Sequence, residues 1–293
     1  MDERRLSYFL AIVEAGSVTA AAARLHVAQP SLSQALRALE RELGATLFDR
    51  VGRGLQLTSA GRALIGPARQ ALIALDAARD AVTEIADVLA GELSIAALAT
   101  LAADPLAELV GRFRVAHPGV TVQIGEAESG ADAGRLVAEG TRELGLVHLP
   151  LARTRLEATP LGSQELLFVL PPGGELDRRP LTPAALCSMP LIVTAPGTST
   201  RELLEQAFAA AGVVPAIAVQ TTAREAIVPL VLAGAGAALL PGALAREAER
   251  RGARVRAARP ALTRAIGLVS RPGPLSSAAR AFTAIAVRGD KDH

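Results

Sequence analysis

The sequence of 293 residues contains no tryptophan, one tyrosine and a single cysteine, Cys187. One cysteine excludes an intramolecular disulfide and is typical of proteins kept in a reducing compartment. We interpret Cys187 as a small buried hydrophobic residue. Because there are only six phenylalanines, the hydrophobic core must consist mainly of leucine, valine, isoleucine and alanine.

Long apolar runs and an export signal are also missing. No uninterrupted apolar run reaches about 18 residues, so we expect no membrane span. The first residues, MDERRLSYF, form no apolar signal segment. We therefore expect a soluble, cytoplasmic protein, and its length favours two domains.

Sequence motifs of catalysis are absent as well. No Gly-x-Ser-x-Gly sequence occurs. The segment 234–239 lacks the last glycine of a dinucleotide-binding loop, and we interpret it as a helix-to-strand turn. The histidines have no metal-ligand spacing; they are His26, His117, His148 and His293. We expect no enzyme activity, no cofactor and no metal.

Total charge gives little support for a nucleic-acid partner. The formal net charge is +2, and residues 1–58 hold seven arginines against six acidic residues. That balance is weak for a DNA-binding domain. Between residues 24 and 53, however, five arginines face three acidic residues, so the placement of charge is more informative than its sum.

What the sequence does contain is a dense series of helix signals before residue 58. A first helix has one apolar stripe, made of Leu6, Phe9, Leu10 and Val13. We expect Gly16 to end this helix and Ser17 to cap the alanine-rich second helix. A third helix opens at Gln29 and Pro30, because proline in a first turn sacrifices no helical hydrogen bond.

The third helix has an apolar and a polar face. Leucines spaced 4, 3 and 4 residues apart are expected to face inward: Leu32, Leu36, Leu39 and Leu43. On the opposite face, a glutamine such as Gln34 can hydrogen-bond adenine, and Ser33 can donate or accept. Arg24 and the helix N-terminus suit phosphates. Such a face is merely solvated in many helices, but the preceding helices and the following turn favour insertion into the major groove.

The segment after this helix predicts a wing. Residues 55–57 alternate as a short strand, and residues 51–54 form a turn with two glycines. Arg50 and Arg53 could then reach a neighbouring minor groove. The alternative is a pair of arginines that only keep the loop solvated.

Residues 15–61, AGSVTAAAARLHVAQPSLSQALRALERELGATLFDRVGRGLQLTSAG, closely resemble the helix-turn-helix of LysR-type transcriptional regulators. The resemblance extends over the whole chain and includes FRVAHPGVTVQI at 113–124. It implies a sequence-specific DNA-binding regulator. Our candidate DNA-binding residues are Arg24, Gln29, Pro30, Ser31, Ser33, Gln34, Arg37, Arg50 and Arg53. Ala28 departs from the family, which commonly has a serine there, and a lost capping hydroxyl costs about 1 kcal/mol.

Residues 59–89 predict one long helix, capped by Thr58 and bent near Gly66 and Pro67. Its apolar positions alternate at spacings of 4 and 3: Leu64, Ala68, Ala71, Leu75, Ala78, Val82, Ile85 and Leu89. This pattern favours pairing with a second helix, although a helix lying on its own domain remains an alternative. A pair would carry two DNA-binding heads. The resemblance implies a homodimer or homotetramer formed through this linker helix.

From residue 90 onward, apolar strands alternate with helices, which predicts an α/β domain with largely parallel sheets. One of its helices is expected to have Asp104 as its cap and Pro105 at its first position. The resemblance implies a periplasmic-binding-protein-like domain of two lobes. Lobe one would span about 90–161 and 267–293, and lobe two about 162–266. The expected fold class is thus α/β, with an all-α winged helix-turn-helix at 1–58, a linker helix at 59–89 and an effector-binding domain at 90–293.

In such domains ligands bind beyond the carboxyl ends of the strands. The turns at 99–101 and 197–201 offer hydroxyls, free N–H groups and helix N-termini, which suit an anion. A carboxylate effector is our hypothesis, although each hydroxyl could simply cap its helix and Arg201 is interpreted as a solvated charge. The candidate effector-binding residues are Thr100, Leu101, Ser129, Thr198, Ser199, Thr200 and Thr222.

Two functions follow from these patterns. The first is a transcriptional regulator that binds double-stranded DNA and a small-molecule effector, with RNA polymerase as a further candidate partner. The second is a solute-binding or enzymatic α/β protein whose N-terminal helices bind a protein partner. The missing export signal and catalytic motifs favour the regulator.

Overall fold

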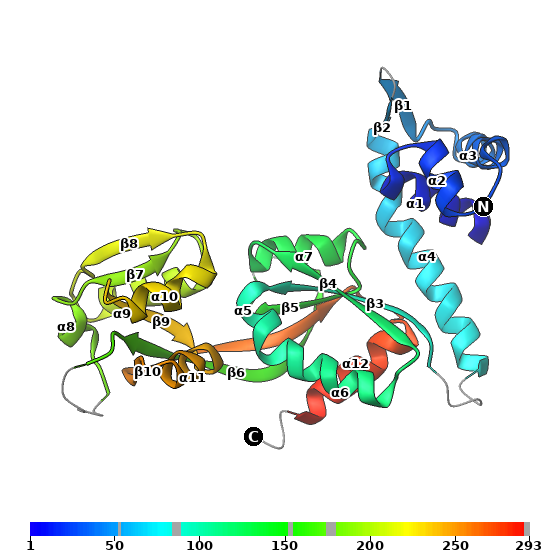
Figure 1. Ribbon diagram of the computed structural model, residues 1–293. Coiled ribbons are helices and arrows are strands. Elements are labelled where there is room, and N and C mark those ends of the chain that lie inside the picture. The colour runs from blue at the N-terminus through cyan, green and yellow to red at the C-terminus, as the bar shows by residue number, and fades with distance from the viewer. Residues whose placement is uncertain (52–53, 84–88, 152–154, 174–179, 290–293) are drawn as a thin grey trace.

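The head of the molecule consists of three helices and a two-stranded wing, α1 (Glu3–Ala15), α2 (Val18–Arg24), α3 (Gln29–Leu43), β1 (Phe48–Val51) and β2 (Gly54–Leu57) (Figure 1). The computed structural model describes residues 1–51, 54–83, 89–151, 155–173 and 180–289. Gly16 ends α1 with a φ of 68°. The Ser17 hydroxyl accepts a hydrogen bond from the Ala20 N–H at 3.1 Å. Both predicted helix boundaries are confirmed.

The core of the head is made by the inward faces of these helices. Phe9, Leu32 and Leu39 are completely buried, and Leu36 is half-buried. Leu43, however, is 40% exposed. The expectation that all four leucines of α3 face inward is therefore wrong at its last position. The reason is that Gly44, with a φ of 65°, ends the helix there, at the edge of the core.

Helix α4 (Ser59–Thr83) leads from the head to the rest of the chain. The Thr58 hydroxyl accepts a hydrogen bond from the Gly61 N–H at 2.9 Å, which confirms the predicted cap. Residues 84–88, including Ile85 of the predicted pattern, lie outside the described residues. Leu89 is in no helix and packs against the core of the first lobe, so the helix does not continue to Leu89 as expected.

The larger domain is built on one eight-stranded sheet with the order β4-β3-β5-β10-β6-β9-β7-β8. Its strands are β3 (Gly91–Leu98), β4 (Val120–Ala127), β5 (Leu144–His148), β6 (Glu157–Leu170), β7 (Leu191–Thr194), β8 (Ile217–Thr221), β9 (Ala237–Pro241) and β10 (Arg254–Ser270). The outer pairs are parallel. The central strands β6 and β10 pair antiparallel with each other and with β5 and β9. The sheet is thus parallel at its two ends and antiparallel in its middle.

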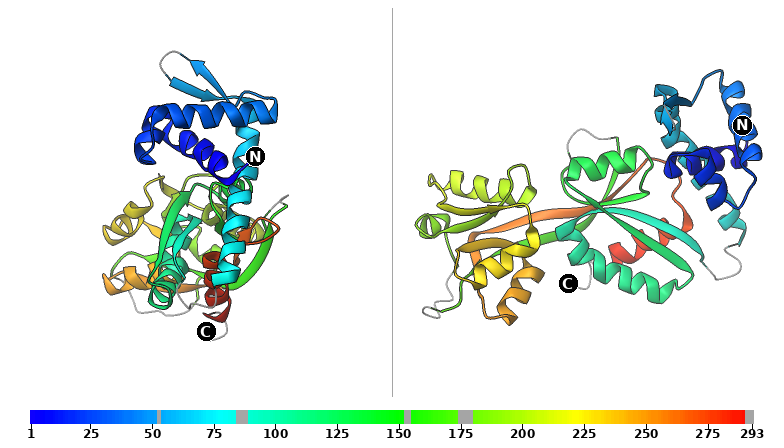
Figure 2. Two further views of the ribbon diagram at one scale, coloured as in Figure 1. Left: turned by 90° about the vertical axis from the view of Figure 1, so that its right-hand side faces the viewer. Right: turned by 45° about the horizontal axis from the view of Figure 1, so that its top comes forward.

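The long strands β6 and β10 connect two lobes (Figure 1). Lobe one holds β3–β5 with α5 (Ala99–Leu101), η2 (Ala102–Leu106), α6 (Ala107–Ala116), α7 (Gly130–Ala138) and α12 (Ser277–Gly289). Its main core packs α6 and α12 on one face of the sheet, and α7 covers the other face. Asp104 has the extended backbone of a cap residue (φ −157°, ψ 117°), but its carboxylate accepts no capping hydrogen bond from a described residue. Figure 2 shows the head beside lobe one, away from lobe two.

Lobe two holds β7–β9 with α8 (Pro183–Leu186), α9 (Ser199–Ala210), η3 (Arg224–Ala226), α10 (Ile227–Leu232) and α11 (Gly242–Arg250). Helices α8 and α9 cover one face of its sheet, and α10 and α11 cover the other. The predicted turn at 234–239 does join a helix to a strand, since α10 ends at Leu232 and β9 begins at Ala237. Cys187 is exposed, so its interpretation as a buried residue is wrong.

Candidate DNA interface and effector cleft

The first turns of α3 present a polar surface. Gln29, Pro30, Ser31, Gln34 and Arg37 are exposed, and Ser33 is half-buried. These residues share one end and one side of the helix because α3 buries Leu32 and Leu39 against α1 and α2. The outward polar face predicted for this helix is therefore present.

Two of these side chains are bound to each other. The Gln29 side-chain amide donates a hydrogen bond to the Ser33 hydroxyl at 2.9 Å. Gln34 and the guanidinium of Arg37 bond to no described residue, so they are free to bind a ligand. Ala28 forms no side-chain cap, and the Ser31 N–H bonds instead to the Ala28 carbonyl at 3.0 Å. Because Pro30 has no N–H, the Gln29 N–H is the group in this turn that is left for an acceptor such as a phosphate oxygen.

Further along α3, a groove lies between the helix and the segment that leads to β1. It is lined by Gln34, Arg37, Glu40, Arg41, Gly44, Ala45 and Thr46. Arg41 lies on the polar face that the sequence predicts for this helix, four residues after Arg37, although it was not among the candidate contact residues. Thr46 follows the helix end and carries no sequence signal.

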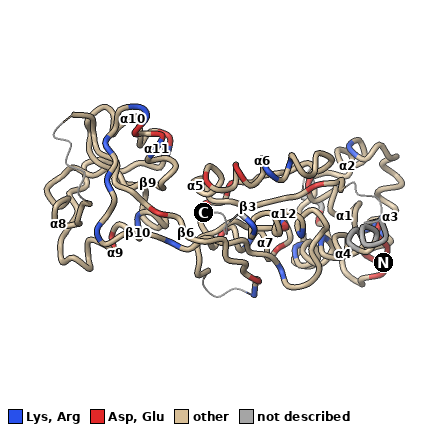
Figure 3. The backbone as a smooth tube through the Cα atoms, turned by 90° about the horizontal axis from the view of Figure 1, so that it is seen from below, with Lys and Arg blue, Asp and Glu red and all other residues tan. Residues whose placement is uncertain are grey.

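The other predicted DNA contacts, Arg24, Arg50 and Arg53, lie outside α3. Arg24 forms an ion pair with Glu14 at 2.9 Å. Both side chains are exposed, so this pair is weak and a phosphate can compete for the arginine. Arg50 pairs through its backbone with Leu55. The Arg50 side chain and the whole of Arg53 lie outside what the structure describes. Charge elsewhere is spread over the whole chain, as Figure 3 shows.

The second candidate site lies between the two lobes, where the strands of both lobes end. Thr100 lies on α5, directly after β3. Ser129 caps α7 by accepting a hydrogen bond from the Asp132 N–H at 3.1 Å. This is the helix-capping role given above as the alternative to effector binding. The Leu101 side chain is completely buried in the core of lobe one. Because α5 turns this side chain inward, any contact of Leu101 with an effector would be through its backbone.

In lobe two, Thr198, Ser199 and Thr200 open helix α9. The Thr198 hydroxyl donates to the Ala195 carbonyl at 2.9 Å and lies 2.5 Å from the Thr194 hydroxyl, so it is already engaged. Arg201 is only 8% exposed and binds Glu205 at 2.5 Å. The interpretation of Arg201 as a solvated charge is wrong, because α9 turns it towards the core. Thr222 follows β8 and is exposed.

Ser199 leads to a group of residues that the sequence did not indicate. The Arg264 guanidinium, on β10, donates to the Ser199 hydroxyl at 2.8 Å. It also donates to the Gln164 side-chain oxygen, at 3.0 Å from Nη2 and 3.3 Å from Nε. Gln164, on β6, donates in turn to the Asp104 carbonyl at 3.2 Å. Residues from both lobes and both connecting strands therefore meet at Arg264.

The field at this point is positive. Burial, followed by the nearby Arg224, lowers the pKa of Arg264 to about 10. Burial, followed by Arg264 and Arg224, lowers the pKa of His148 to about 4, so this imidazole is neutral near pH 7. Neither ring nitrogen of His148 has a hydrogen-bond partner among the described residues. Arg264 forms no ion pair with a described acidic residue.

A metal site and a membrane span find no support in the described part of the chain. It contains no group of three or more histidine, cysteine, aspartate or glutamate residues that could hold a metal ion. No single described helix is long and apolar enough to cross a membrane. The bent pair α1 and α2, at 114°, passes by length and composition, but its buried apolar residues belong to the core of the head.

A winged helix-turn-helix joined by a long helix to a two-lobed α/β domain defines a class of DNA-binding transcriptional regulators with a ligand-binding domain. Two family models match the chain: "Bacterial regulatory helix-turn-helix protein, lysR family" over residues 4–62, and "LysR substrate binding domain" over residues 86–290. The chain therefore belongs to the LysR family of transcriptional regulators.

Individual relatives agree with this assignment. The transcriptional regulator IlvR of Caulobacter vibrioides is 35% identical over 251 residues, which cover 83% of each chain. Full-length CbnR in complex with its target DNA is 26% identical with a TM-score of 0.65, and the match covers 99% of this chain and 100% of that one. Full-length OxyR from Pseudomonas aeruginosa has a TM-score of 0.77 over 99% and 95% of the chains; at 20% identity it supports the fold alone. These relatives favour the regulator over the alternative of a solute-binding or enzymatic protein.

Proposed function

We propose that this regulator reads double-stranded DNA with α3 and the β1–β2 wing. Gln34, with Gln29, Ser31 and Ser33, would contact base edges, since amide and hydroxyl groups can distinguish bases. The arginines would bind phosphates or a minor groove and fix the register: Arg24, Arg37, Arg50 and Arg53. Pro30 would set the first turn of the helix. The free amide of Gln34 and the free guanidinium of Arg37 support this division.

The effector would be a small carboxylate held between the lobes. Arg264 carries this proposal, because it is half-buried and charged, and among the described residues its guanidinium bonds only to the neutral side chains of Ser199 and Gln164. A guanidinium has five N–H donors, so two remain for a carboxylate. Thr100, Ser129, Thr198, Thr200 and Thr222 would line the same cleft. The N-terminus of α9 adds a favourable dipole.

The organisation of the chain would follow the predicted boundaries: a head at 1–58, a linker helix at 59–89 and an effector domain at 90–293. Within that domain, lobe one would take 90–161 and 267–293, and lobe two 162–266. We infer a homodimer or homotetramer formed through α4, where Leu75 and Ala78 are exposed. The protein would act in the cytoplasm, where its DNA lies, with RNA polymerase as a further partner and no enzymatic role.

The decisive experiment combines DNA binding with a panel of small carboxylates. Fluorescence anisotropy with fragments from upstream of neighbouring genes should show binding that weakens steeply with salt. A carboxylate effector should shift this binding and should stabilise the protein by about 2.7 kcal/mol at a hundred times its Kd. Arg264→Gln should abolish both effects, whereas Arg251→Gln, at an exposed position directly after α11, should abolish neither. A carboxylate that acts equally on both variants would refute the role of Arg264.

A further inference from the structure

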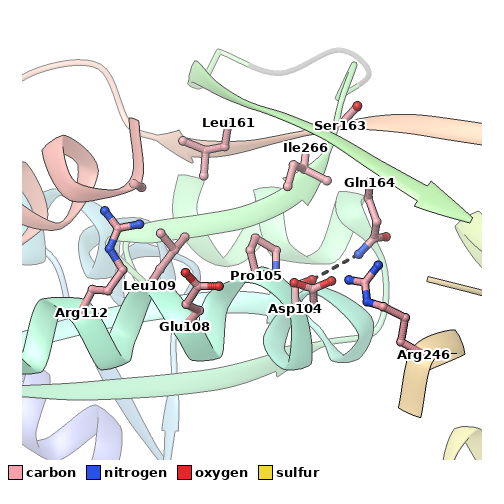
Figure 4. Close-up of a pocket in the computed structure, with 11 residues that line it drawn as sticks. Asp104, Pro105, Glu108, Leu109, Arg112, Leu161, Ser163, Gln164, Arg246 and Ile266 are labelled. Carbon is pink, nitrogen blue, oxygen red and sulfur yellow. Dashed lines mark hydrogen bonds between the residues drawn. The ribbon is translucent and has the colours of Figure 1, made fainter. Parts of the chain in front are cut away.

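A second cavity, of about 380 Å³, lies between α6 of lobe one, α11 of lobe two and the two connecting strands (Figure 4). This volume is in the range of small-molecule sites, about 300 to 1,000 Å³. The cavity shares Gln164 with the cleft described above, but neither Arg264 nor any of the seven candidate effector residues lines it. It is therefore a separate candidate site.

Four charged side chains line this cavity. Asp104 and Glu108 come from lobe one, Arg112 from α6 one turn beyond Glu108, and Arg246 from α11. None of them forms an ion pair with a described residue, even though Glu108 and Arg112 have the spacing at which helical pairs form. In Figure 4 the two carboxylates lie in the middle of the cavity, Arg246 lies beside Asp104, and Arg112 lies at the other end.

The wall opposite these charges is apolar. Leu161 and Ile266, from the connecting strands, face α6 across the cavity (Figure 4). Together with Leu109 they are at most 7% exposed. The cavity thus combines two carboxylates, two guanidinium groups and an aliphatic wall. An occupant must offer a cation, an anion and an apolar group at short distances from one another.

We propose that this cavity binds a free α-amino acid with an aliphatic side chain. Its ammonium group would bind Asp104 and Glu108, and its carboxylate would bind Arg246. The side chain would pack against Leu109, Leu161 and Ile266. A simple carboxylic acid would offer no cation to Asp104 and Glu108, and a simple amine would offer no anion to Arg246. A polar amino acid would leave the aliphatic wall without a partner.

Binding at this place would join the two lobes. The ammonium partners belong to lobe one, while Arg246 belongs to α11 of lobe two. One ligand would therefore contact both lobes at once and favour the separation between them that matches its own length. A ligand that binds one arrangement of the lobes better than another shifts the protein towards it.

Isothermal titration calorimetry of the full chain with L-leucine tests the proposal. We expect binding of L-leucine, and at least about tenfold weaker binding of 4-methylpentanoate, 3-methylbutylamine and L-serine, each of which lacks one of the three groups. Equal binding of all four compounds would overturn the proposal. The same conclusion would follow if L-leucine, L-isoleucine and L-valine all failed to bind.

Variants locate the binding and separate it from the proposed effector site. Arg246→Gln and Glu108→Gln should each weaken L-leucine binding about tenfold or more. Arg250→Gln is the matched control, one turn further along α11 and exposed, and should leave it unchanged. Arg264→Gln should abolish the response to a carboxylate effector while L-leucine still binds. Loss of L-leucine binding in Arg264→Gln, but not in Arg246→Gln, would place it in the cleft and refute the second site.

Discussion

Arg264 shows how one residue can be placed for binding rather than for stability. It lies on β10 in the middle of the sheet and is half-buried, and burial lowers its pKa to about 10. It nevertheless remains charged near pH 7. A buried charge without an opposite partner is unfavourable, and its hydrogen bonds to Ser199 and Gln164 compensate only in part. A bound carboxylate would supply the missing charge.

His148, on the neighbouring strand β5, predicts a pH-dependent stability. Its pKa is about 4 in the folded chain, against an ordinary value of 6.5, because burial and then Arg264 and Arg224 disfavour the charged form. The unfolded chain therefore binds this proton more readily. The contribution of His148 is fully present above pH 6.5 and is lost as the pH falls from there towards 4.

The expected result is that His148→Asn loses less stability than the wild type when the pH is lowered. Urea unfolding of both proteins at about pH 7 and about pH 5 measures this difference. Both proteins contain the same carboxylates, including Glu143, whose pKa is raised mainly by burial. The contribution of these carboxylates to the pH dependence therefore cancels in the comparison. An identical loss of stability in the two proteins would contradict the assignment.

Two neighbouring side chains on α3 should affect DNA binding differently. Gln34→Ala removes a base-contacting amide, so it should relax the preference at particular base pairs, at a cost of about 1–3 kcal/mol. Arg37→Ala removes a phosphate contact, so it should weaken binding to most sequences and lower the salt dependence by about one charge. Binding measured on a set of single-base operator variants at two salt concentrations distinguishes the two. A uniform loss for both variants would disprove this division.

At the scale of single elements, helix caps differ along the chain. Several helices begin with a side chain that accepts the N–H three residues later: Asp2, Ser17, Ser129 and Thr182. Helix α3 begins instead with Ala28, whose backbone is extended (φ −67°, ψ 130°) but which has no acceptor. The first turn of α3 therefore has no side-chain cap, and the Ser31 N–H bonds to the Ala28 carbonyl at 3.0 Å.

Ala28→Ser should supply the missing cap. Its hydroxyl could accept the Ser31 N–H, and the free energy of unfolding of the head should rise by about 1 kcal/mol. Urea unfolding followed by circular dichroism measures the gain. The matched control is Ala23→Ser within α2, where an exposed serine cannot cap and should lower stability by a few tenths of a kcal/mol. An equal effect of the two substitutions would exclude capping as the cause.

Elements fixed by neighbouring residues could be predicted, and contacts between distant residues could not. Gly16, Ser17 and Thr58 each act within three or four residues along the chain, so their roles are visible in the sequence. Arg264 bonds to Ser199 across 65 positions and to Gln164 across 100. Only the sheet topology brings them together. The sequence did not single out Arg264, because β10 also contains Arg254, Arg256 and Arg259.

Helix α4 shows the same difference between a local pattern, which the sequence reveals, and a distant contact, which it does not. Its pattern of apolar residues predicts a helix pair, but the pattern does not identify the partner. The first three positions, Leu64, Ala68 and Ala71, pack against the core of the chain's own head. This part of the stripe follows the alternative interpretation, a helix lying on its own domain. Only the later positions remain for a second copy.

At the scale of the whole molecule, the two lobes are connected by strands β6 and β10. The pairing of β6 with β10 has register shifts between Ala257 and Leu262 and between Ala265 and Gly267. Such irregularities bend a strand locally, and the second of them adjoins Arg264. A ligand beside Arg264 would thus lie next to an irregularity in one of the strands that connect the lobes. It can change DNA binding only if it prefers one arrangement of the heads.

In the proposed dimer, the arrangement of the heads would depend on how α4 pairs, which gives the last prediction. Leu75 is 42% exposed and Ala78 is exposed, beyond the part of α4 that the head covers. A glutamate in an apolar helix seam would be desolvated on pairing. Leu75→Glu should therefore shift the protein towards monomers in sedimentation velocity experiments. It should also weaken binding to a two-fold operator far more than binding to a half-site, because two linked heads bind with a high effective concentration.

Gln70→Glu adds the same charge to an exposed position outside the seam and should change neither measurement. If Leu75→Glu remains assembled as Gln70→Glu does, the prediction is contradicted, and the copies must associate through the effector domains instead.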